Sequence, residues 1–253
     1  MNLKEMIIKR NSIRKYDMSP LESEILAEVN EIISQTKPLF LCSGSYGFRI
    51  VGFDEFYAKT NGMFRINAPH YLLLFGDGSD DAYKNIGYVG ELVALKLAEM
   101  NIGTCWLGGA KSTEVKEHNE YTISIAFGKP LADFRKSADD AKRKALDSIA
   151  EGYNEEIRDI LEYVRLAPSA INLQPWHFKC ETPTSPEVFH IHIFRNKPRH
   201  LFNLIMRKHL EMMQKIDIGI AISHFGVATF EFKKLDIEDE GLIYEGSVCL
   251  KMP

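Results

Sequence analysis

The chain has 253 residues, of which 45% are hydrophobic and 26% charged, a composition ordinary for a globular protein with one large core or two small ones. A net charge of −4 gives no broad basic field, which argues against nucleic acid or an anionic membrane surface as the main partner. Charged residues interrupt the N-terminus from Lys4 onward, and no later run is apolar for long enough to span a bilayer, so we expect a cytoplasmic protein.

The first part of the chain alternates helical and strand patterns. The apolar positions within Leu3 to Ile8 predict a short helix that stops at the polar run Arg10 to Tyr16. Ser19 followed by Pro20 is typical of an N-cap and a first helical residue, so a second helix is expected to begin there. The later elements expected are strands over Phe48–Val51, Pro69–Phe75 and Ile123–Phe127, and an apolar-striped helix over about Tyr83–Met100 that stops at Gly103.

A charged segment separates this part from a similar second part. Residues Arg135 to Lys144 are almost all charged or small and have no apolar period, so they predict the connection between two halves. We expect a first half over residues 1–134, a charged linker or connecting helix over 135–150 and a second half over 151–253. In the second half, the apolar spacing from Ile157 to Val164 repeats the earlier spacing from Ile25 to Ile32, and Trp176–Cys180 and Val188–Ile193 resemble the two earlier strands.

The repeat has a constant spacing. The tripeptide Asp217–Gly219, at the head of a second long apolar helix, resembles Asn85–Gly87 in the first half. The distance from Ile25 to Gly87 is 62 residues, and so is the distance from Ile157 to Gly219. A shared order and spacing indicate an old duplication. Because helices and strands cluster without strict βαβ alternation, the expected fold class is α+β, with each sheet packed against helices, and not a parallel doubly wound fold.

The four cysteines and the clustered histidines were considered as possible metal or redox sites. No CxxC pair and no metal-ligand spacing is present, so we expect reduced and mostly buried thiols. No acidic or cysteine partner is spaced to complete a histidine site, and we predict no metal centre. No Ser-His-Asp or Cys-His arrangement can be recognised either. The residues concerned are Cys42, Cys105, Cys180, Cys249, His190, His192, His200 and His209.

One polar segment has side chains suited to an anion. Arg10, Ser12 and Arg14 stand at alternate positions, so an extended backbone would direct two guanidiniums and a hydroxyl to one side. The planar fork of donors of an arginine suits a phosphate. The alternative is a solvated basic loop, which this run taken alone favours.

Two further segments suit a bound ligand. Between a predicted helix and strand, the segment Ala167–Trp176 crowds the side chains of Ser169, Asn172 and Gln174 between two prolines. Such a preformed polar loop suits a flat heterocycle, and equally a helix stop in which the tryptophan anchors the core. The paired glycines of Gly103–Gly109 would let a ligand approach the backbone closely, although an ordinary turn has the same pattern. Rossmann and P-loop motifs are absent from the sequence.

Together, these three segments resemble those of the nitroreductase family of FMN-dependent enzymes. The resemblance is carried by PSAINLQPW at Pro168–Trp176, RNSIRKY at Arg10–Tyr16 and GTCWLGG at Gly103–Gly109. In ordinary members of that family, one subunit supplies the Arg-Ser-Arg segment (here Arg10–Arg14). Its dimer partner supplies the Pro-Ser loop (here Pro168–Gln174), and the flavin lies between them.

The order of the motifs departs from the family pattern. The place that the Pro-Ser loop ordinarily takes in the first half is held by CSGSYG at Cys42–Gly47, and the second half has no Arg-Ser-Arg segment and no GTCW. Because the losses are complementary, the chain resembles a tandem pseudodimer with one flavin site, as in the TM1586-like nitroreductase subgroup.

The resemblance implies roles for the basic residues. Arg10 and Ser12 would hold the FMN phosphate or ribityl chain. Arg14 would lie near N1 and the C2 carbonyl of the ring, where a cation stabilises the reduced flavin. Arg135 follows a predicted strand and would reach the phosphate, with Lys136 as the alternative; the linker interpretation competes with both.

The resemblance also implies contacts with the flavin ring. Pro168, Ser169 and Asn172 would contact the ring and the ribityl chain from the second half. Leu107 and Gly108 would offer a backbone N–H toward N5. No residue of the chain is assigned as a catalytic acid or base.

The implied activity is that of an FMN-dependent oxidoreductase. A hydride would pass from NADH or NADPH through the flavin to a small oxidised acceptor such as a nitroaromatic or a quinone. The alternatives are an FMN-binding or flavin-sequestering protein with little turnover and a flavin-free structural relic, because a fold alone does not define a function. A small-molecule acceptor is the expected partner, and a monomer is possible because both parts of the flavin site are in one chain.

Overall fold

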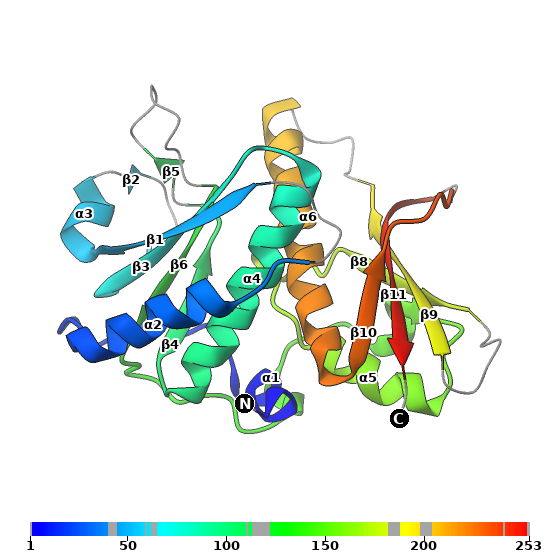
Figure 1. Cartoon of the computed structure of the whole chain (residues 1–253), viewed down its shortest axis with the longest axis horizontal. Coiled ribbons are helices and arrows are strands. Elements are labelled where there is room, and N and C mark those ends of the chain that lie inside the picture. Colours follow the sequence, from blue (N-terminus) through cyan, green and yellow to red (C-terminus); the bar gives the residue numbers. More distant parts are fainter. Residues whose placement is uncertain are drawn as a thin grey trace.

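The computed structural model describes residues 2–39, 45–58, 60–61, 65–109, 111–112, 122–181, 188–197, 204–239 and 241–251. Two larger sheets lie on either side of two long helices that cross at the centre of the molecule (Figure 1). This arrangement is a mixed α+β fold, as the sequence predicted. Within the described ranges, no helix has both the length and the apolar character needed to cross a membrane.

The first half contains a four-stranded sheet. Its elements are α1 (Leu3–Lys9), α2 (Ser23–Gln35), β1 (Tyr46–Gly52), α3 (Phe53–Ala58), β2 (Thr60–Asn61), β3 (His70–Gly76), α4 (Asp80–Glu99), β4 (Gly103–Leu107), β5 (Lys111–Ser112) and β6 (Ile123–Gly128). The strand order is β1-β3-β6-β4, and every neighbouring pair is antiparallel. The predicted apolar stripe of the long helix is confirmed, because Ile86, Val89 and Val93 of α4 are completely buried.

The second half contains a five-stranded sheet. Its elements are β7 (Ala150–Glu151), α5 (Glu155–Arg165), β8 (Trp176–Cys180), β9 (Val188–Asn196), α6 (Leu204–His224), β10 (Thr229–Lys233) and β11 (Leu242–Lys251). Short 3₁₀ turns occur at Ala138–Asp140, Leu146–Ser148, Ala170–Asn172 and Phe225–Val227. The strand order is β10-β11-β9-β8-β7, with β7 parallel to β8 and the other pairs antiparallel.

The two halves share one topology. Reading along the chain, α2, β1, β3, α4, β4 and β6 correspond to α5, β8, β9, α6, β10 and β11. The order β1-β3-β6-β4 in the first sheet then corresponds to β8-β9-β11-β10 in the second, and only the edge strand β7 is additional among the described strands. The same connectivity appears twice in one chain.

The contact between α4 and α6 depends on two glycines. A Cβ atom on Gly87 would lie 2.0 Å from the carbonyl oxygen of Ile216, and one on Gly219 would lie 2.0 Å from that of Lys84. Only glycine allows two helix backbones to approach this closely. The contacts are reciprocal, because 219 minus 87 and 216 minus 84 both give 132 residues.

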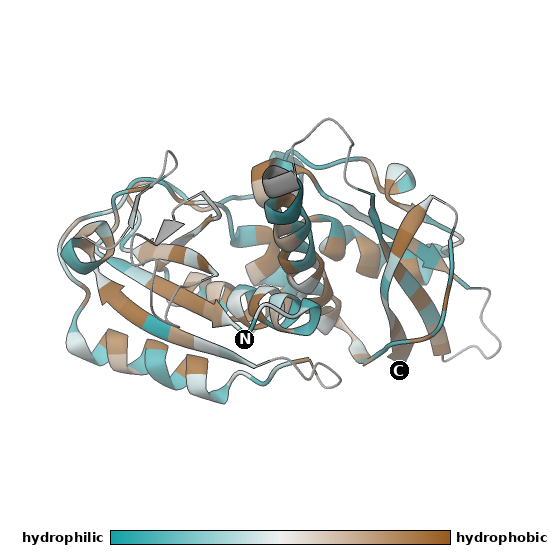
Figure 2. Ribbon diagram, turned by 90° about the horizontal axis from the view of Figure 1, so that it is seen from above, coloured by the Kyte–Doolittle hydropathy of each residue, from teal (hydrophilic) through white to brown (hydrophobic). Residues whose placement is uncertain are grey.

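One hydrophobic core runs through both halves. It joins residues of both sheets, of α4, of α5 and of α6, and apolar residues follow the strands of both sheets in the view from above (Figure 2). Its most deeply buried members include Leu74, Ile86, Val93, Ile193, Ile216 and Val248. Because the core is continuous, burial of apolar surface stabilises the packing of the halves against each other.

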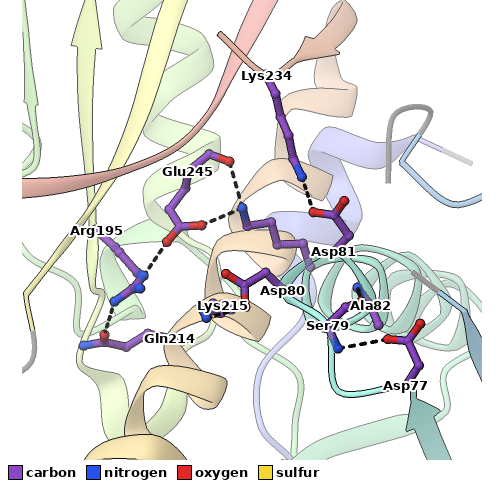
Figure 3. Close-up of polar contacts among 11 residues, drawn as sticks. Asp77, Ser79, Asp80, Asp81, Ala82, Arg195, Gln214, Lys215, Lys234 and Glu245 are labelled. Atoms are coloured by element: carbon purple, nitrogen blue, oxygen red, sulfur yellow. Dashed lines mark hydrogen bonds and ion pairs between the residues drawn. The ribbon is translucent and has the colours of Figure 1, made fainter. Parts of the chain in front are cut away.

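Buried charges also join the halves. Lys84 of α4 lies 2.6 Å from the carboxylate of Glu245 on β11, which also accepts from Arg195 of β9, and Arg195 donates to Gln214 of α6 at 3.3 Å (Figure 3). All four side chains are at most 5% exposed. At the surface, Lys215 of α6 pairs with Asp80 of α4 at 2.5 Å. Removing one partner from such a buried cluster leaves an uncompensated charge, so these contacts fix the relative position of the halves.

Two predicted helix boundaries are wrong. The second helix begins at Ser23 and not at Pro20, because the N–H of Leu21 is donated to Nε2 of His70, 49 residues further along the chain, at 2.9 Å. The N–H of Ser19 is donated to Asp17 at 2.9 Å, which holds a turn before the helix.

The ends of the long helices also differ from prediction. Helix α4 stops before Asn101, whose φ of 58° is left-handed, while Gly103 already belongs to β4. Asp217 lies well inside α6 and not at its head, because that helix begins at Leu204.

Candidate functional site

The Arg-Ser-Arg segment runs beside β4. The N–H of Ile13 donates to the carbonyl of Thr104 at 2.9 Å, and Ser12 pairs with Thr104 in a parallel bridge. Two of the three segments singled out in the sequence, Arg10–Arg14 and Gly103–Gly109, are therefore held together by backbone hydrogen bonds.

The three polar side chains of this segment lie around one thiol. Burial raises the pKa of Cys105, while the guanidiniums of Arg14 and Arg10 and a hydrogen bond with Ser12 lower it. All three side chains are thus close enough to act on the same sulfur. They differ in exposure, because Arg10 is only 4% exposed whereas Arg14 is open to solvent.

Arg10 is paired with a buried carboxylate. Its Nε lies 3.4 Å from Oε1 of Glu91 on α4, and the other carboxylate oxygen accepts a hydrogen bond from Nε1 of Trp106 at 2.8 Å. Burial raises the pKa of Glu91, but Arg10 and His224 beside it outweigh this effect and hold that pKa below its usual value. Nη2 of Arg10 is buried and has no hydrogen-bond partner among the described residues.

The Pro-Ser loop has a strained backbone. Ile171, Asn172 and Gln174 have φ values of 45°, 57° and 47°, a left-handed conformation that is uncommon outside glycine and rare for a β-branched residue. The loop closes on itself, because the N–H of Gln174 donates to the hydroxyl of Ser169 at 2.8 Å. The side chain of Ile171 is 85% exposed at its tip. Strain of this kind concentrates at ligand-binding sites, where the surrounding structure maintains it.

Helix α6 fixes the base of the loop. The N–H of Ala170 donates to Oδ1 of Asp217 at 3.0 Å. Asp217 is buried, and burial raises the pKa of its carboxyl to about 8, although the hydrogen bond from Ala170 lowers it. The first half has a matching contact, since Oδ1 of Asn85 accepts from the N–H of Leu39 at 3.0 Å. Asn85 and Asp217 are also 132 residues apart.

Arg143 links the Pro-Ser loop to the Arg-Ser-Arg segment. Its guanidinium donates to Oδ1 of Asn172 at 3.1 Å and to the carbonyl of Leu166 at 3.0 Å. Burial lowers the pKa of Arg143 to about 10, and the positive charges of Arg10 and then Arg135 lower it further. The loop of the second half and the basic segment of the first half therefore meet around a cluster of guanidiniums.

Sequence reasoning missed Arg143 and its neighbour Lys144. Both lie in the segment interpreted as a charged linker, yet the N–H of Lys144 donates to Oε1 of Gln174 at 2.8 Å, and Nζ donates to the carbonyl of Gln174 at 3.0 Å. The only signal in the sequence was the run of three cations at Lys142–Lys144.

Arg135 has a defined local partner. Its Nε and Nη2 donate to the carbonyls of Ile8 and Ile7, both at 2.6 Å, and so satisfy the C-terminal end of α1. Burial and the nearby Arg10 lower the pKa of Arg135 to about 10. Arg135 therefore supports the segment that begins with Arg10; whether it or Lys136 reaches a phosphate stays a prediction.

The end of β4 meets the second half. Leu107 is 3% exposed, and a Cβ atom on Gly108 would lie 2.4 Å from the terminal methyl of Met213 on α6. The glycine thus permits a close contact between the GTCWLGG segment and α6.

The donor set fits a phosphate-bearing flavin. Arg10, Arg135 and Arg143 act on one another as like charges, and Glu91 is the acidic residue that acts on both Arg135 and Arg143. Such a cluster offers charge-assisted donors for a dianion. The buried Nη2 of Arg10 also lacks a partner within the described part of the chain.

A second polar cluster lies outside this region and does not form an active site. Nδ1 of His192 contacts Oγ of Ser247 at 2.7 Å, and Nε2 contacts Glu181 at 2.7 Å. Oγ of Ser247 also contacts the hydroxyl of Tyr244 at 2.7 Å, and Ser247 is only 2% exposed. A serine this enclosed is not accessible to a substrate. In the ranges that the structure covers, no group of three or more His, Cys, Asp or Glu residues could hold a metal ion.

The fold defines an α+β protein built from two similar sheet and helix units. Residues 2–229 match the family described as "Putative TM nitroreductase", and the chain belongs to this family. A search of curated proteins gave no match.

Solved structures of similar fold include a nitroreductase of Thermotoga maritima, with 21% identity and a TM-score of 0.64 over 99% of this chain and 94% of that one. Lower similarity was found to an NADH oxidase of Clostridium acetobutylicum (19% identity, TM-score 0.45, 58% of this chain and 99% of that one). An FMN-dependent nitroreductase of Clostridium difficile shares 17% identity, with a TM-score of 0.40 over 60% of this chain and 92% of that one.

Proposed function

We propose that the protein is an FMN-dependent oxidoreductase that draws electrons from NADH or NADPH. Its membership of a nitroreductase family supports an oxidoreductase. The observation that supports FMN is the meeting of Arg10, Arg143 and Asn172 from the two halves, because it combines a basic cluster with a strained polar loop. A terminal phosphate would satisfy the cluster, and the loop would contact the ring system.

The roles of the basic residues follow from their exposure. Arg10 and Arg143 hold the phosphate, with Ser12 on the ribityl chain and Arg135 supporting the segment from behind. Arg14, which is open to solvent, lies toward N1 of the ring and stabilises negative charge there.

The ring is held from both halves. Pro168, Ser169 and Asn172 contact it and the ribityl chain from the Pro-Ser loop, while Leu107 and Gly108 direct a backbone N–H toward N5. When bound, FMN supplies the redox chemistry, a hydride taken from NADH or NADPH and passed to a small oxidised acceptor such as a nitroaromatic or a quinone. Donor and acceptor would use the same open face in turn, which gives ping-pong kinetics.

We further propose that the chain is a tandem pseudodimer with one flavin site. The shared topology, the reciprocal glycine contacts and the paired roles of Asn85 and Asp217 support a pseudo-two-fold axis between α4 and α6. Such an axis relates Gly108 and Met213 to Lys234 and Asp81, which follow β10 and lie on α4.

The place related to the flavin site carries charge in place of open backbone. Lys234 and Asp81 form an ion pair where the axis would put the contact between Gly108 and Met213 (Figure 3). An ion pair at this position fills the second site, so one FMN per chain is expected, and both parts of its site lie in a single monomer.

An FMN-binding protein with little turnover is the second candidate. The strain in the Pro-Ser loop supports tight ligand binding as well as it supports catalysis. Reduction by a nicotinamide distinguishes the two.

The test uses the purified full-length protein. We expect a yellow protein that releases FMN, not FAD, on denaturation, and whose flavin absorbance bleaches when NADH or NADPH is added without oxygen in a stopped-flow instrument. A protein that stays colourless and takes up no added FMN would contradict the cofactor. A flavin that binds but is not bleached would favour the protein with little turnover.

A further inference from the structure

Glu91 is the most enclosed charged residue near the candidate site. It is fully buried in α4, and it contacts side chains from three other elements. These are Arg10 of the Arg-Ser-Arg segment, Trp106 of β4 and His224 of α6. A carboxylate is stable in such a place only when charged or hydrogen-bonding partners compensate its loss of water.

The contact with Glu91 determines how Arg10 presents its donors. Nε faces Oε1 of Glu91 at 3.4 Å, which leaves Nη2 at the far end of the planar guanidinium. This Nη2 atom is buried and has no hydrogen-bond partner in the part of the chain that the structure describes. A guanidinium held through Nε on one side keeps its terminal donors free for an anion on the other.

The second half takes part in this contact through His224. Nδ1 of His224 lies 2.9 Å from the carbonyl oxygen of Tyr163 on α5, and because a carbonyl only accepts, Nδ1 must carry the hydrogen. Nε2 is thereby directed to Oε1 of Glu91, 3.5 Å away. The carboxylate therefore lies between a cation of the first half and a histidine that the second half orients.

We infer that Glu91 is a positioning residue, which orients Arg10 toward the phosphate of FMN and does not itself contact the flavin. This inference rests on the proposed function. The alternative is that Glu91 only stabilises the fold, as a buried charge does wherever it has partners. The two roles differ in one respect: a positioning role affects the phosphate alone, whereas a structural role affects every part of the ligand.

Riboflavin separates these roles, because it has the same ring and ribityl chain as FMN but no phosphate. We would measure the dissociation constants of both flavins by fluorescence quenching with the full-length wild type, Glu91→Gln and Glu91→Asp. Glu91→Gln keeps an acceptor for Trp106 but removes the charge, and Glu91→Asp keeps the charge but withdraws it from Arg10. Glu245→Gln is the matched control, because it also removes a carboxylate from a buried cluster, at a place away from Arg10.

In Glu91→Gln, we expect FMN to bind about tenfold more weakly while riboflavin changes by less than about twofold, since loss of one oriented charge-assisted contact to a phosphate has this size. Glu91→Asp should show the same selective loss, and it supplies the measurement if the glutamine variant does not fold. Glu245→Gln should change both constants by one common factor.

The outcomes separate this inference from the proposed function. A wild-type protein that binds neither flavin would contradict the proposed function itself. A wild type that prefers FMN, with an equal or larger preference in both Glu91 variants, would overturn the positioning role and leave the cofactor assignment intact.

Discussion

Asp217 and Asn85 occupy corresponding places in the two halves but differ in chemistry. Each accepts a backbone N–H through Oδ1, from Ala170 and Leu39 respectively. Asn85 does so as a neutral amide, whereas Asp217 is a carboxyl whose pKa burial raises to about 8. At neutral pH, Asp217 is therefore mainly protonated and resembles the amide of its counterpart.

This difference predicts a pH dependence of stability. The pKa of Asp217 rises from 3.8 in the unfolded chain to about 8 on folding, so the unfolded state loses its proton first. The free energy of unfolding of the wild type should therefore fall as pH rises from about 4 to about 8, by about 1.4 kcal/mol per pH unit at most, and stay level above that. Asp217→Asn removes this contribution.

Urea denaturation of the wild type and Asp217→Asn at several pH values measures it. The variant should match the wild type near pH 4 and be more stable at pH 8, by on the order of a few kcal/mol. The difference between the two proteins isolates Asp217 from the other carboxyls. A difference that does not change with pH would show that Asp217 stays ionised in the folded protein.

At the residue scale, sequence patterns located the segments but not all of the side chains that matter. Arg10, Ser12 and Arg14 were recognisable because alternate spacing along an extended backbone is a local property. Arg143 was not, because its importance comes from contact with Asn172, 29 residues away, and from its proximity to Arg10. Glu91 was missed as well, since a single acid within an apolar helical stripe gives no sign of the cation that it will face.

At the scale of elements, the crossing of α4 and α6 is the most constrained feature. Gly87→Ala and Gly219→Ala each place a methyl group where a backbone carbonyl oxygen lies 2.0 Å away, and neither helix can move without disturbing the core on both sides. We expect each variant to lose about 2 kcal/mol or more of unfolding free energy, the cost typical of overpacking.

Gly47→Ala is the matched control for this prediction. Gly47 lies in β1, and no described atom is within 4 Å of the place where its Cβ would be. Its stability should stay within about 0.5 kcal/mol of the wild type. Thermal unfolding compares the three variants, and equal melting temperatures for all of them would show that the helices separate without cost.

Long periodic elements were predictable and helix ends were less so. The apolar stripe of α4 and the strand Trp176–Cys180 follow directly from local periodicity. The start of α2 does not, because the partner of Leu21 is the ring of His70 in a distant strand. A boundary set by tertiary contact leaves no mark in the neighbouring residues.

At the scale of the whole molecule, the pseudodimer predicts how the site assembles. Arg10→Ala and Asn172→Ala alter opposite halves, and each should weaken the same FMN-binding event by about tenfold or more. Mixing the two variants should not restore a wild-type site, because the two parts of the site come from one chain. Flavin absorbance against protein mass should give one FMN per chain.

Complementation by mixing would show instead that halves of different chains meet. Two FMN per chain would contradict the single site, because the second half offers no Arg-Ser-Arg segment. Gel filtration of the mixture, before and after FMN is added, controls for exchange between molecules.

The contact between α4 and α6 lies within one polypeptide, and this changes how it responds to dilution. In a dimer, two such helices separate as the concentration falls below their dissociation constant. Here the connection through residues 100–203 keeps each helix at a fixed effective concentration near the other. Their association is consequently a unimolecular step, equally complete in a cell that makes a few copies of the protein and in one that makes many.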